Sequence, residues 1–146
     1  MNNFLNEIII SYRTPKTKKF KVANLNNAVD FVKSLYKAST IELYETVYLL
    51  LLNNNNEIKG YYKLTDGATD KAIIDVKLIY SIALKTLASG IIIAHNHPSG
   101  NPQPSKEDIH ITKNIKEIGG LLEITLLDHI IVTRDNTTSF AYQGLL

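Results

Sequence analysis

The sequence contains no cysteine among its 146 residues. This absence excludes disulfides, thiolate metal ligands and cysteine nucleophiles, so any bound metal must be held by nitrogen and oxygen atoms. A chain without cysteine also suits a reducing compartment, and we expect a cytoplasmic protein. The length predicts a single domain that is large enough to bury a core of its own.

Long apolar runs are also missing. The longest, residues 47–52, is far too short to cross a bilayer. The N-terminal sequence MNNFLNEIIISYRT lacks the basic region and the long apolar stretch of a signal peptide. We therefore expect a soluble, intracellular protein that does not act at a membrane.

The sequence has little excess of charge of either sign, since the formal net charge is only +2. A charge this small does not by itself predict a nucleic-acid partner. One basic cluster lies near the N-terminus and consists of Arg13, Lys16, Lys18, Lys19 and Lys21. It has the composition of a phosphate-contacting arm, but we favour the simpler interpretation of a solvated segment near a terminus.

Apolar residues that recur every three to four positions predict three helices, over residues 28–36, 76–87 and 105–122. Capping residues predict where these helices begin and end. They are Asn26 or Asn27 at the first start, Gly90 after the second helix, Ser105 at the third start, and Gly119 and Gly120 at the third end. Of the apolar residues, Leu87 is expected on the buried side of the second helix.

Short apolar runs bounded by turn residues predict the strands. They lie at residues 6–12, 47–52, 58–64, 91–94, 124–133 and 138–142. Residues 53–56 are all asparagine and predict a hairpin turn, and residues 65–70 are expected to form a loop. Because helices separate the later strands, we expect an α/β fold in which helices pack on a mixed sheet.

The most informative segment is residues 94–108, with the sequence AHNHPSGNPQPSKED. His95 and His97 follow a predicted strand, and residues i and i+2 of an extended chain point the same way, about 6.6 Å apart. Two such imidazoles can bind one ion at about 2.0–2.1 Å each. The loop rich in proline and glycine then turns the chain, and Asp108 in the first helical turn is the expected third ligand. Three protein ligands and an open fourth position are typical of catalytic Zn²⁺.

Such a site also needs a proton acceptor that is not a ligand, because bound Zn²⁺ lowers the pKa of a water molecule to about 7. Glu45 is the candidate, since it directly precedes the buried strand at residues 47–52 and is placed at the mouth of a central strand. Glu42 is the competing candidate. It lies further from the strand, and we expect its side chain to be solvated.

Each site residue also has a purely structural explanation. Ser105 and Asp108 fit the N-cap and N3 positions of a capping box. A buried histidine is more often a hydrogen-bonded core residue than a ligand. The combination of His95, His97, Ser105 and Asp108 at a fixed spacing nevertheless favours a metal site. Ser105 can stabilise an oxyanion or only cap the helix, and both possibilities stay open.

A second polar pair, Asp128 and His129, interrupts an apolar strand. It is either a satisfied pair that stabilises the fold, which we favour, or a partner of the site or of a substrate. His110 follows Asp108 by two residues, so it points elsewhere on the predicted helix and is expected to be exposed.

The pattern His95-x-His97-x7-Ser105-x2-Asp108 resembles the metal motif of the JAB/MPN (JAMM) metalloprotease superfamily. The segments HNHPSGNPQPSKEDIHIT, LLDHIIVT and SFAYQGLL resemble, more closely, the bacterial RadC family. This likeness covers residues 38–146. Residues 1–37 are expected to form a strand and a helix that belong to this domain or pack on it.

The resemblance implies a JAB/MPN-like α/β (α+β) fold, with a mixed curved sheet, flanking helices and cytidine-deaminase-like layering. It implies Zn²⁺ bound by His95, His97 and Asp108, with Glu45 as general base and Ser105 beside the oxyanion. Characterised superfamily members cleave peptide or isopeptide bonds, which implies a zinc-dependent metallopeptidase or isopeptidase with such a substrate.

The RadC name suggests an alternative, a DNA repair or recombination accessory protein that acts on or near DNA. Larger RadC proteins carry an N-terminal helix-hairpin-helix region, and the first 37 residues here lack that pattern. Many deubiquitinating members carry Ser or Thr between the two histidines, where this sequence has Asn96. A third possibility, a binding scaffold that makes little use of the metal, is disfavoured by the complete set of site residues.

Overall fold

The computed structural model describes residues 9, 11, 19–69 and 72–146. Within these residues three helices and five strands follow one another. They are α1 (Leu25–Ser34), β1 (Glu45–Leu52), β2 (Ile58–Ala68), α2 (Val76–Lys85), β3 (Gly90–Asn96), α3 (Lys106–Leu121), β4 (Thr125–Val132) and β5 (Thr137–Ser139). The strand expected at residues 6–12, apart from Ile9 and Ser11, and the basic residues Arg13, Lys16 and Lys18 lie outside the described residues.

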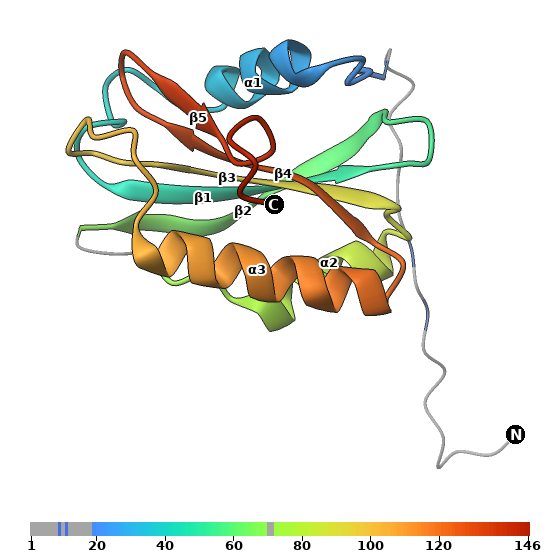
Figure 1. The fold of residues 1–146 in the computed structure, drawn as a ribbon. Helices are drawn as coiled ribbons and strands as arrows, with labels where there is room; N and C mark the ends of the chain where they lie inside the picture. The colour runs from blue at the N-terminus through green and yellow to red at the C-terminus, as the bar shows by residue number, and fades with distance from the viewer. Residues whose placement is uncertain (1–8, 10, 12–18, 70–71) are drawn as a thin grey trace, which may run out of the picture.

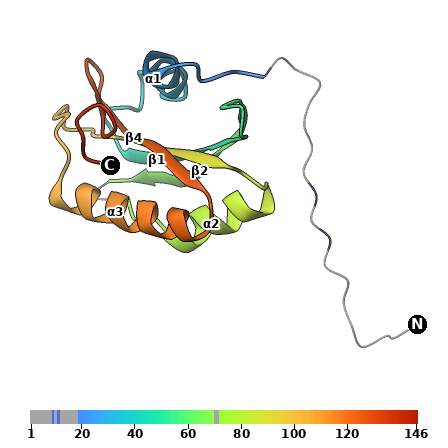
Figure 2. The ribbon, with the colours of Figure 1, turned by 45° about the vertical axis from the view of Figure 1, so that its right-hand side comes forward.

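The strands form one mixed sheet in the order β2-β1-β3-β4-β5. Strands β3 and β4 are parallel, and every other neighbouring pair is antiparallel. Helix α1 covers one face of the sheet, and α2 and α3 cover the other (Figures 1 and 2). The predicted architecture of helices packed on a mixed sheet is therefore confirmed.

The two central strands, β1 and β3, are buried on both faces, as continuous apolar runs predict. Because side chains alternate along a strand, Ile91 and Ile93 pack against α2 and α3, whereas Ile92 and Ala94 pack against α1. Continued to the end of β3, this alternation directs His95 toward the α3 side of the sheet and Asn96 toward the α1 side.

Strand β2 is longer than predicted, because it continues to Ala68 through the residues expected to form a loop. It pairs with β1 as far as Glu45, and register shifts occur between Glu45 and Thr46 and between Val47 and Tyr48. Gly67 has a φ of 82°, which a glycine tolerates within an irregular strand. The polar and glycine residues that suggested a loop therefore belong to a bulged strand that leads up to Glu45.

Helices α1 and α2 end differently from the prediction. The side chain of Asn24, not of Asn26 or Asn27, caps α1 by accepting the backbone N–H of Asn27 at 3.1 Å. Helix α2 ends at Lys85, and Gly90 is the first residue of β3 instead of a helix cap. Leu87 lies after the helix with a φ of 51° and is 78% exposed, so its predicted place in the core is wrong.

Helix α3 runs through Gly119 and Gly120 instead of ending there. Gly119 is required for packing, since a Cβ at this position would collide with the backbone oxygen of Ile124. The positive φ after the helix, 57°, belongs to Glu123. The last strand is also shifted, because β5 covers Thr137–Ser139 and a turn follows where the strand at 138–142 was expected.

Among the described residues, no helix combines the length and the apolar character needed to cross a membrane.

Candidate metal centre

The two histidines lie where β3 ends. His95 is fully buried and pairs with Val47 of β1, and the backbone N–H of His97 donates to the carbonyl oxygen of Val132 at 3.0 Å. His97 Nδ1 lies 2.8 Å from the carbonyl oxygen of Asn101. Because a carbonyl oxygen only accepts hydrogen bonds, Nδ1 carries the proton and the lone pair of His97 is on Nε2. The loop therefore presents His97 to the site through its Nε2 atom.

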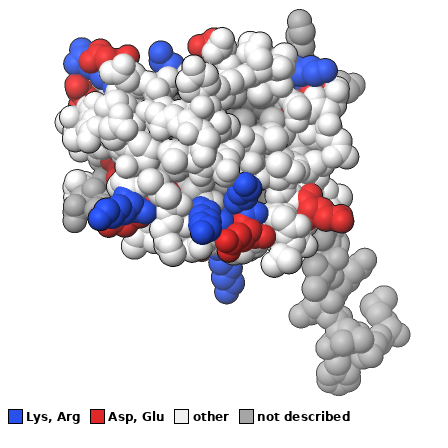
Figure 3. Space-filling model, viewed as in Figure 1, with Lys and Arg blue, Asp and Glu red and all other residues white. Residues whose placement is uncertain are grey.

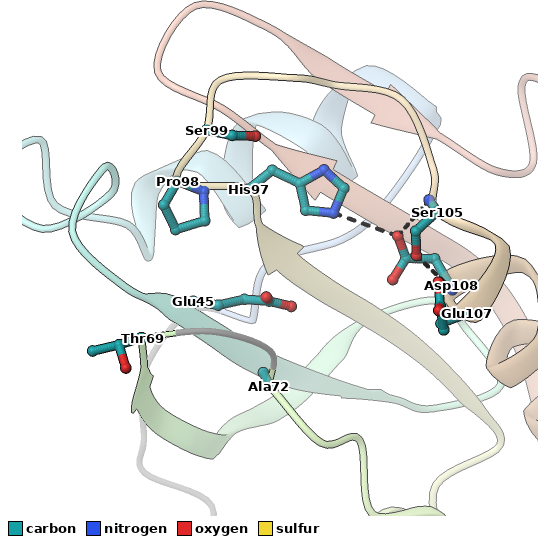
Figure 4. A pocket seen from close by; sticks show the side chains of 9 residues that line it. All are labelled: Glu45, Thr69, Ala72, His97, Pro98, Ser99, Ser105, Glu107 and Asp108. Atoms are coloured by element: carbon teal, nitrogen blue, oxygen red, sulfur yellow. Dashed lines mark hydrogen bonds and ion pairs between the residues drawn. The ribbon is translucent and has the colours of Figure 1, made fainter.

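The loop that follows brings the start of α3 back to the histidines (Figure 4). The Asp108 carboxylate accepts the backbone N–H of Ser105 at 2.7 Å, and the Ser105 hydroxyl accepts the N–H of Asp108 at 3.0 Å. This is a complete capping box. The same carboxylate lies beside both imidazoles, so the structural and the ligand interpretations of Asp108 do not exclude each other.

The spacing of the three side chains fits one tetrahedral ion. The His95 and His97 Nε2 atoms are 2.9 Å apart, and they lie 3.3 and 3.4 Å from the oxygens of Asp108. Ligand atoms bound to Zn²⁺ at about 2.0–2.1 Å stand roughly 3.3–3.4 Å from one another in a tetrahedron. The three residues therefore lie close enough together to hold one metal ion, because one ligand atom from each lies within 4.8 Å of the others.

The electrostatics of the cluster also favour a cation. Burial disfavours the charged carboxylate, but the neighbouring imidazoles of His95 and His97 outweigh it and hold the pKa of Asp108 well below its usual range. The neighbouring Asp108 carboxylate in turn raises the pKa of His97. An ionised carboxylate beside two imidazoles is a nitrogen-and-oxygen site suited to a divalent transition metal ion.

Glu45 lies beside this cluster because β1 runs antiparallel to β3, so that β1 begins where β3 ends. It borders a cavity of about 380 Å³ together with His97, Ser105 and Asp108. Its carboxylate points into the space that His97 and Asp108 border (Figure 4). The geometry thus brings together all five residues that the sequence singled out, with Glu45 across the cavity from His97 and Asp108.

The other candidates are not in the site. Glu42 is half exposed and forms an ion pair with Arg134 at 2.9 Å. His110 is exposed on α3, as expected, and its Nε2 atom lies 3.3 Å from the amide of Asn114. Both placements follow from sequence position, since Glu42 precedes β1 by three residues and His110 points away from Asp108 on the helix.

Ser105 borders the same cavity. Its hydroxyl oxygen accepts the N–H of Asp108, so the hydroxyl proton remains for a second acceptor. Capping and contact with a bound substrate are therefore compatible for this residue.

Asp128 and His129 have different roles. The buried Asp128 carboxylate accepts hydrogen bonds from the backbone of His129 and Ala141 and from the Ser139 hydroxyl, at 2.8, 3.0 and 2.6 Å. These contacts stabilise the C-terminal turn. His129 is fully buried, and its Nε2 atom lies 2.8 Å from Nδ1 of the candidate ligand His95. His129 is therefore a partner of the site, which is the less favoured of the two interpretations of this pair from sequence.

Asn96 is a residue of the site that sequence reasoning did not single out. Its side chain accepts the N–H of Thr46 and donates to the carbonyl oxygens of Ile41 and Tyr44, at 2.8, 2.7 and 2.9 Å. Two of these residues, Tyr44 and Thr46, directly flank Glu45. The available signal was a polar residue at a position where the alternation of β3 requires burial.

The fold and the cluster define the class of protein, an α/β domain with a two-histidine, one-aspartate site at the end of its central strands. The chain belongs to the RadC family, because the model of the RadC-like JAB domain matches residues 22–145. The match begins before α1 and includes every helix and strand of the sheet.

Three similar proteins are each named UPF0758 protein. The one from Flavobacterium johnsoniae is 39% identical over 102 residues, which cover 70% of this chain and 44% of that protein. The one from Thermotoga maritima is 40% identical over 102 residues, 70% of this chain and 46% of that protein. The one from Clostridium botulinum is 34% identical over 142 residues, 95% of this chain and 62% of that protein. The chain thus spans about half the length of these relatives.

Proposed function

We propose that this domain is a zinc-dependent hydrolase that cleaves a peptide or isopeptide bond. The observation that carries the proposal is the convergence of two imidazoles and one carboxylate on a single point, with a second carboxylate facing them across an open cavity. When Zn²⁺ is bound by His95, His97 and Asp108, it activates water as a nucleophile at neutral pH.

The remaining side chains have roles that follow from their positions. Glu45 accepts the proton that water gives up and returns it to the leaving nitrogen, since its carboxylate points into the cavity that His97 and Asp108 border. The Ser105 hydroxyl donates to the oxyanion that develops on the substrate carbonyl. Ala72 and Pro98 add apolar surface to the lining of the cavity.

Amide substrates are favoured over DNA by the surface charge. On the face shown in Figure 3, lysine and arginine side chains lie among aspartate and glutamate side chains. Helix α3, which runs away from the site, exposes both signs in the form of Lys106, Glu107, Lys113, Lys116 and Glu117. A nucleic-acid interface calls for a continuous basic surface, which this face does not provide.

The test begins with the zinc content of protein purified without added metal, measured by elemental analysis. Turnover is then measured on pools of peptides, isopeptide-linked peptides and single-stranded DNA, each with and without a chelator. We expect one zinc ion for each chain and chelator-sensitive cleavage of amide bonds alone. Chelator-sensitive cleavage of DNA without amide cleavage would instead support the alternative of a protein that acts on DNA.

Glu45→Gln tests the proton acceptor, with Glu42→Gln as the matched control. Loss of a general base typically lowers turnover by about 100- to 10,000-fold. We expect that loss for Glu45→Gln with zinc retained, and wild-type turnover for Glu42→Gln, whose carboxylate pairs with Arg134 outside the cavity. Equal turnover of the two variants would reject Glu45 as the base.

A further inference from the structure

We propose that His129 and Thr112 form a hydrogen-bonded relay that fixes the tautomer of His95 in which Nε2 is free to bind metal. The inference rests on the proposed metal site and adds two positioning residues to it. Neither residue faces the ion. Thr112 lies on α3, one helical turn after Asp108, and is 1% exposed.

The relay begins at a backbone carbonyl, which settles the direction of every bond in it. The Thr112 hydroxyl donates to the carbonyl oxygen of Asp108 at 2.6 Å. A hydroxyl has a single proton, so its oxygen can only accept from the other neighbour, Nδ1 of His129, at 2.6 Å. His129 therefore carries a proton on Nδ1.

The second step assigns the proton position of the candidate ligand His95 from that of His129. The ring of His129 is fully buried, and its two nitrogens contact a hydroxyl and another imidazole instead of a carboxylate, so the ring is neutral and its Nε2 atom has a lone pair. That atom lies 2.8 Å from Nδ1 of His95 and must accept, so His95 carries its proton on Nδ1. The lone pair of His95 is then on Nε2, the atom that faces His97 and Asp108.

The relay matters because the other tautomer of His95 has a competing partner. With its proton on Nε2, His95 could donate to Asp108 at 3.3 Å, and two of the three ligands would bind each other instead of the ion. The ring of His129 is held against rotation by stacking on Phe140, with ring centres 4.6 Å apart and a 20° angle between planes. Protein partners of this kind typically change metal affinity by about 10- to 100-fold.

Thr112→Val is the decisive variant, because it keeps the branched shape and removes only the hydroxyl. Thr112→Ser keeps the hydroxyl and serves as its control. In metal-free protein, long-range ¹H–¹⁵N correlations report which nitrogen of each histidine is protonated. We expect His95 to be protonated on Nδ1 in the wild type and in Thr112→Ser, and on Nε2 in a measurable fraction of Thr112→Val.

The second measurement is the dissociation constant of Zn²⁺, obtained by competition with a chromogenic chelator. We expect Thr112→Val to bind Zn²⁺ about 10- to 100-fold more weakly than wild type, and Thr112→Ser to remain within about threefold. Equal affinity and an unchanged tautomer in Thr112→Val would overturn the relay. If Thr112→Val does not fold, His129→Leu and His129→Gln replace the pair, since only glutamine keeps an acceptor for His95.

The two proposals fail in different ways. If the wild type binds no Zn²⁺, the proposed function is rejected, while the tautomers of metal-free protein still decide the relay. A wild-type His95 protonated on Nε2 would reject the relay even in a protein that binds zinc.

Discussion

The side-chain oxygen of Asn96 accepts the backbone N–H of Thr46 at 2.8 Å, which joins the strand of the candidate ligands to the residue after Glu45. Its amide also donates to the carbonyl oxygen of Tyr44, the residue before Glu45, at 2.9 Å. One buried side chain therefore holds the backbone on both sides of the proposed base. It fixes the base relative to the histidines that lie on either side of Asn96 in the chain.

Asn96→Ala is expected to lower the free energy of unfolding by about 2–4 kcal/mol, because it leaves buried backbone groups without partners. Urea denaturation measures this loss. Turnover should fall by a larger factor than the affinity for Zn²⁺, since the candidate histidine ligands keep their places at the end of β3 while Glu45 loses its fixed position. Asn26→Ala, at an exposed position of α1, should change stability by less than about 0.5 kcal/mol. Wild-type stability in Asn96→Ala would contradict the conclusion that this side chain holds the backbone on both sides of Glu45.

Asp128→Ala and Asp128→Asn should separate hydrogen bonding from charge. Alanine leaves the N–H groups of His129 and Ala141 unpaired and is expected to destabilise the fold by about 2–4 kcal/mol. Asparagine keeps an acceptor for both groups and should be much better tolerated. A loss as large in Asp128→Asn as in Asp128→Ala would mean that the carboxylate charge is itself required.

The stability difference between wild type and Asp128→Asn should depend on pH. Burial raises the pKa of Asp128, so the folded protein holds this proton more tightly than the unfolded chain. The resulting stabilisation is present below the unfolded pKa and is lost as the pH rises through the folded pKa. The wild type should therefore gain stability relative to Asp128→Asn when the pH is lowered from about 7 to about 4. Urea midpoints across this range measure the difference, and the opposite slope would show that the carboxylate is stabilised in its charged form.

Gly119→Ala and Gly120→Ala should have opposite effects within one helix. A Cβ at Gly119 would collide with the carbonyl oxygen of Ile124 and lie 2.8 Å from the Tyr80 hydroxyl, whereas nothing lies within 4 Å of a Cβ at Gly120. Gly119→Ala is expected to destabilise the protein by about 1–3 kcal/mol. Gly120→Ala should stabilise it by about 0.5–1 kcal/mol, because alanine loses less entropy in a helix. Thermal unfolding of the two variants, side by side, checks both signs.

The same two glycines show why some features could not be predicted from sequence. A glycine that ends a helix and a glycine that lets another segment approach look alike in a sequence, and only the position of Ile124 distinguishes them. Leu87 fits the apolar side of α2, but the helix has already ended at Lys85. Periodicity identifies a buried side and does not locate the last turn.

The candidate ligands, in contrast, could be predicted from the sequence, because their placement depends on local geometry. His95 and His97 share a side at the end of a strand, and Asp108 belongs to the first turn of the next helix. The hydrogen bonds that connect Thr112 and His129 to His95 could not be predicted from the sequence. Their contact depends on how α3 packs on the sheet and on the register of β4 with β3, which no local pattern encodes.

Binding of Zn²⁺ should stabilise the fold, because its three ligands come from the end of β3 and the start of α3. A ligand at about 100 times its dissociation constant contributes about 2.7 kcal/mol to the free energy of unfolding. Wild type should therefore melt at a higher temperature with Zn²⁺ than with a chelator, and Glu45→Gln should show the same shift. His97→Ala should lose the shift, because it removes one of the three candidate ligands. His97 is the most exposed of the three, at 17%, so its replacement should disturb the core little. An undiminished zinc-dependent shift in His97→Ala would mean that the ion is bound by a different set of residues.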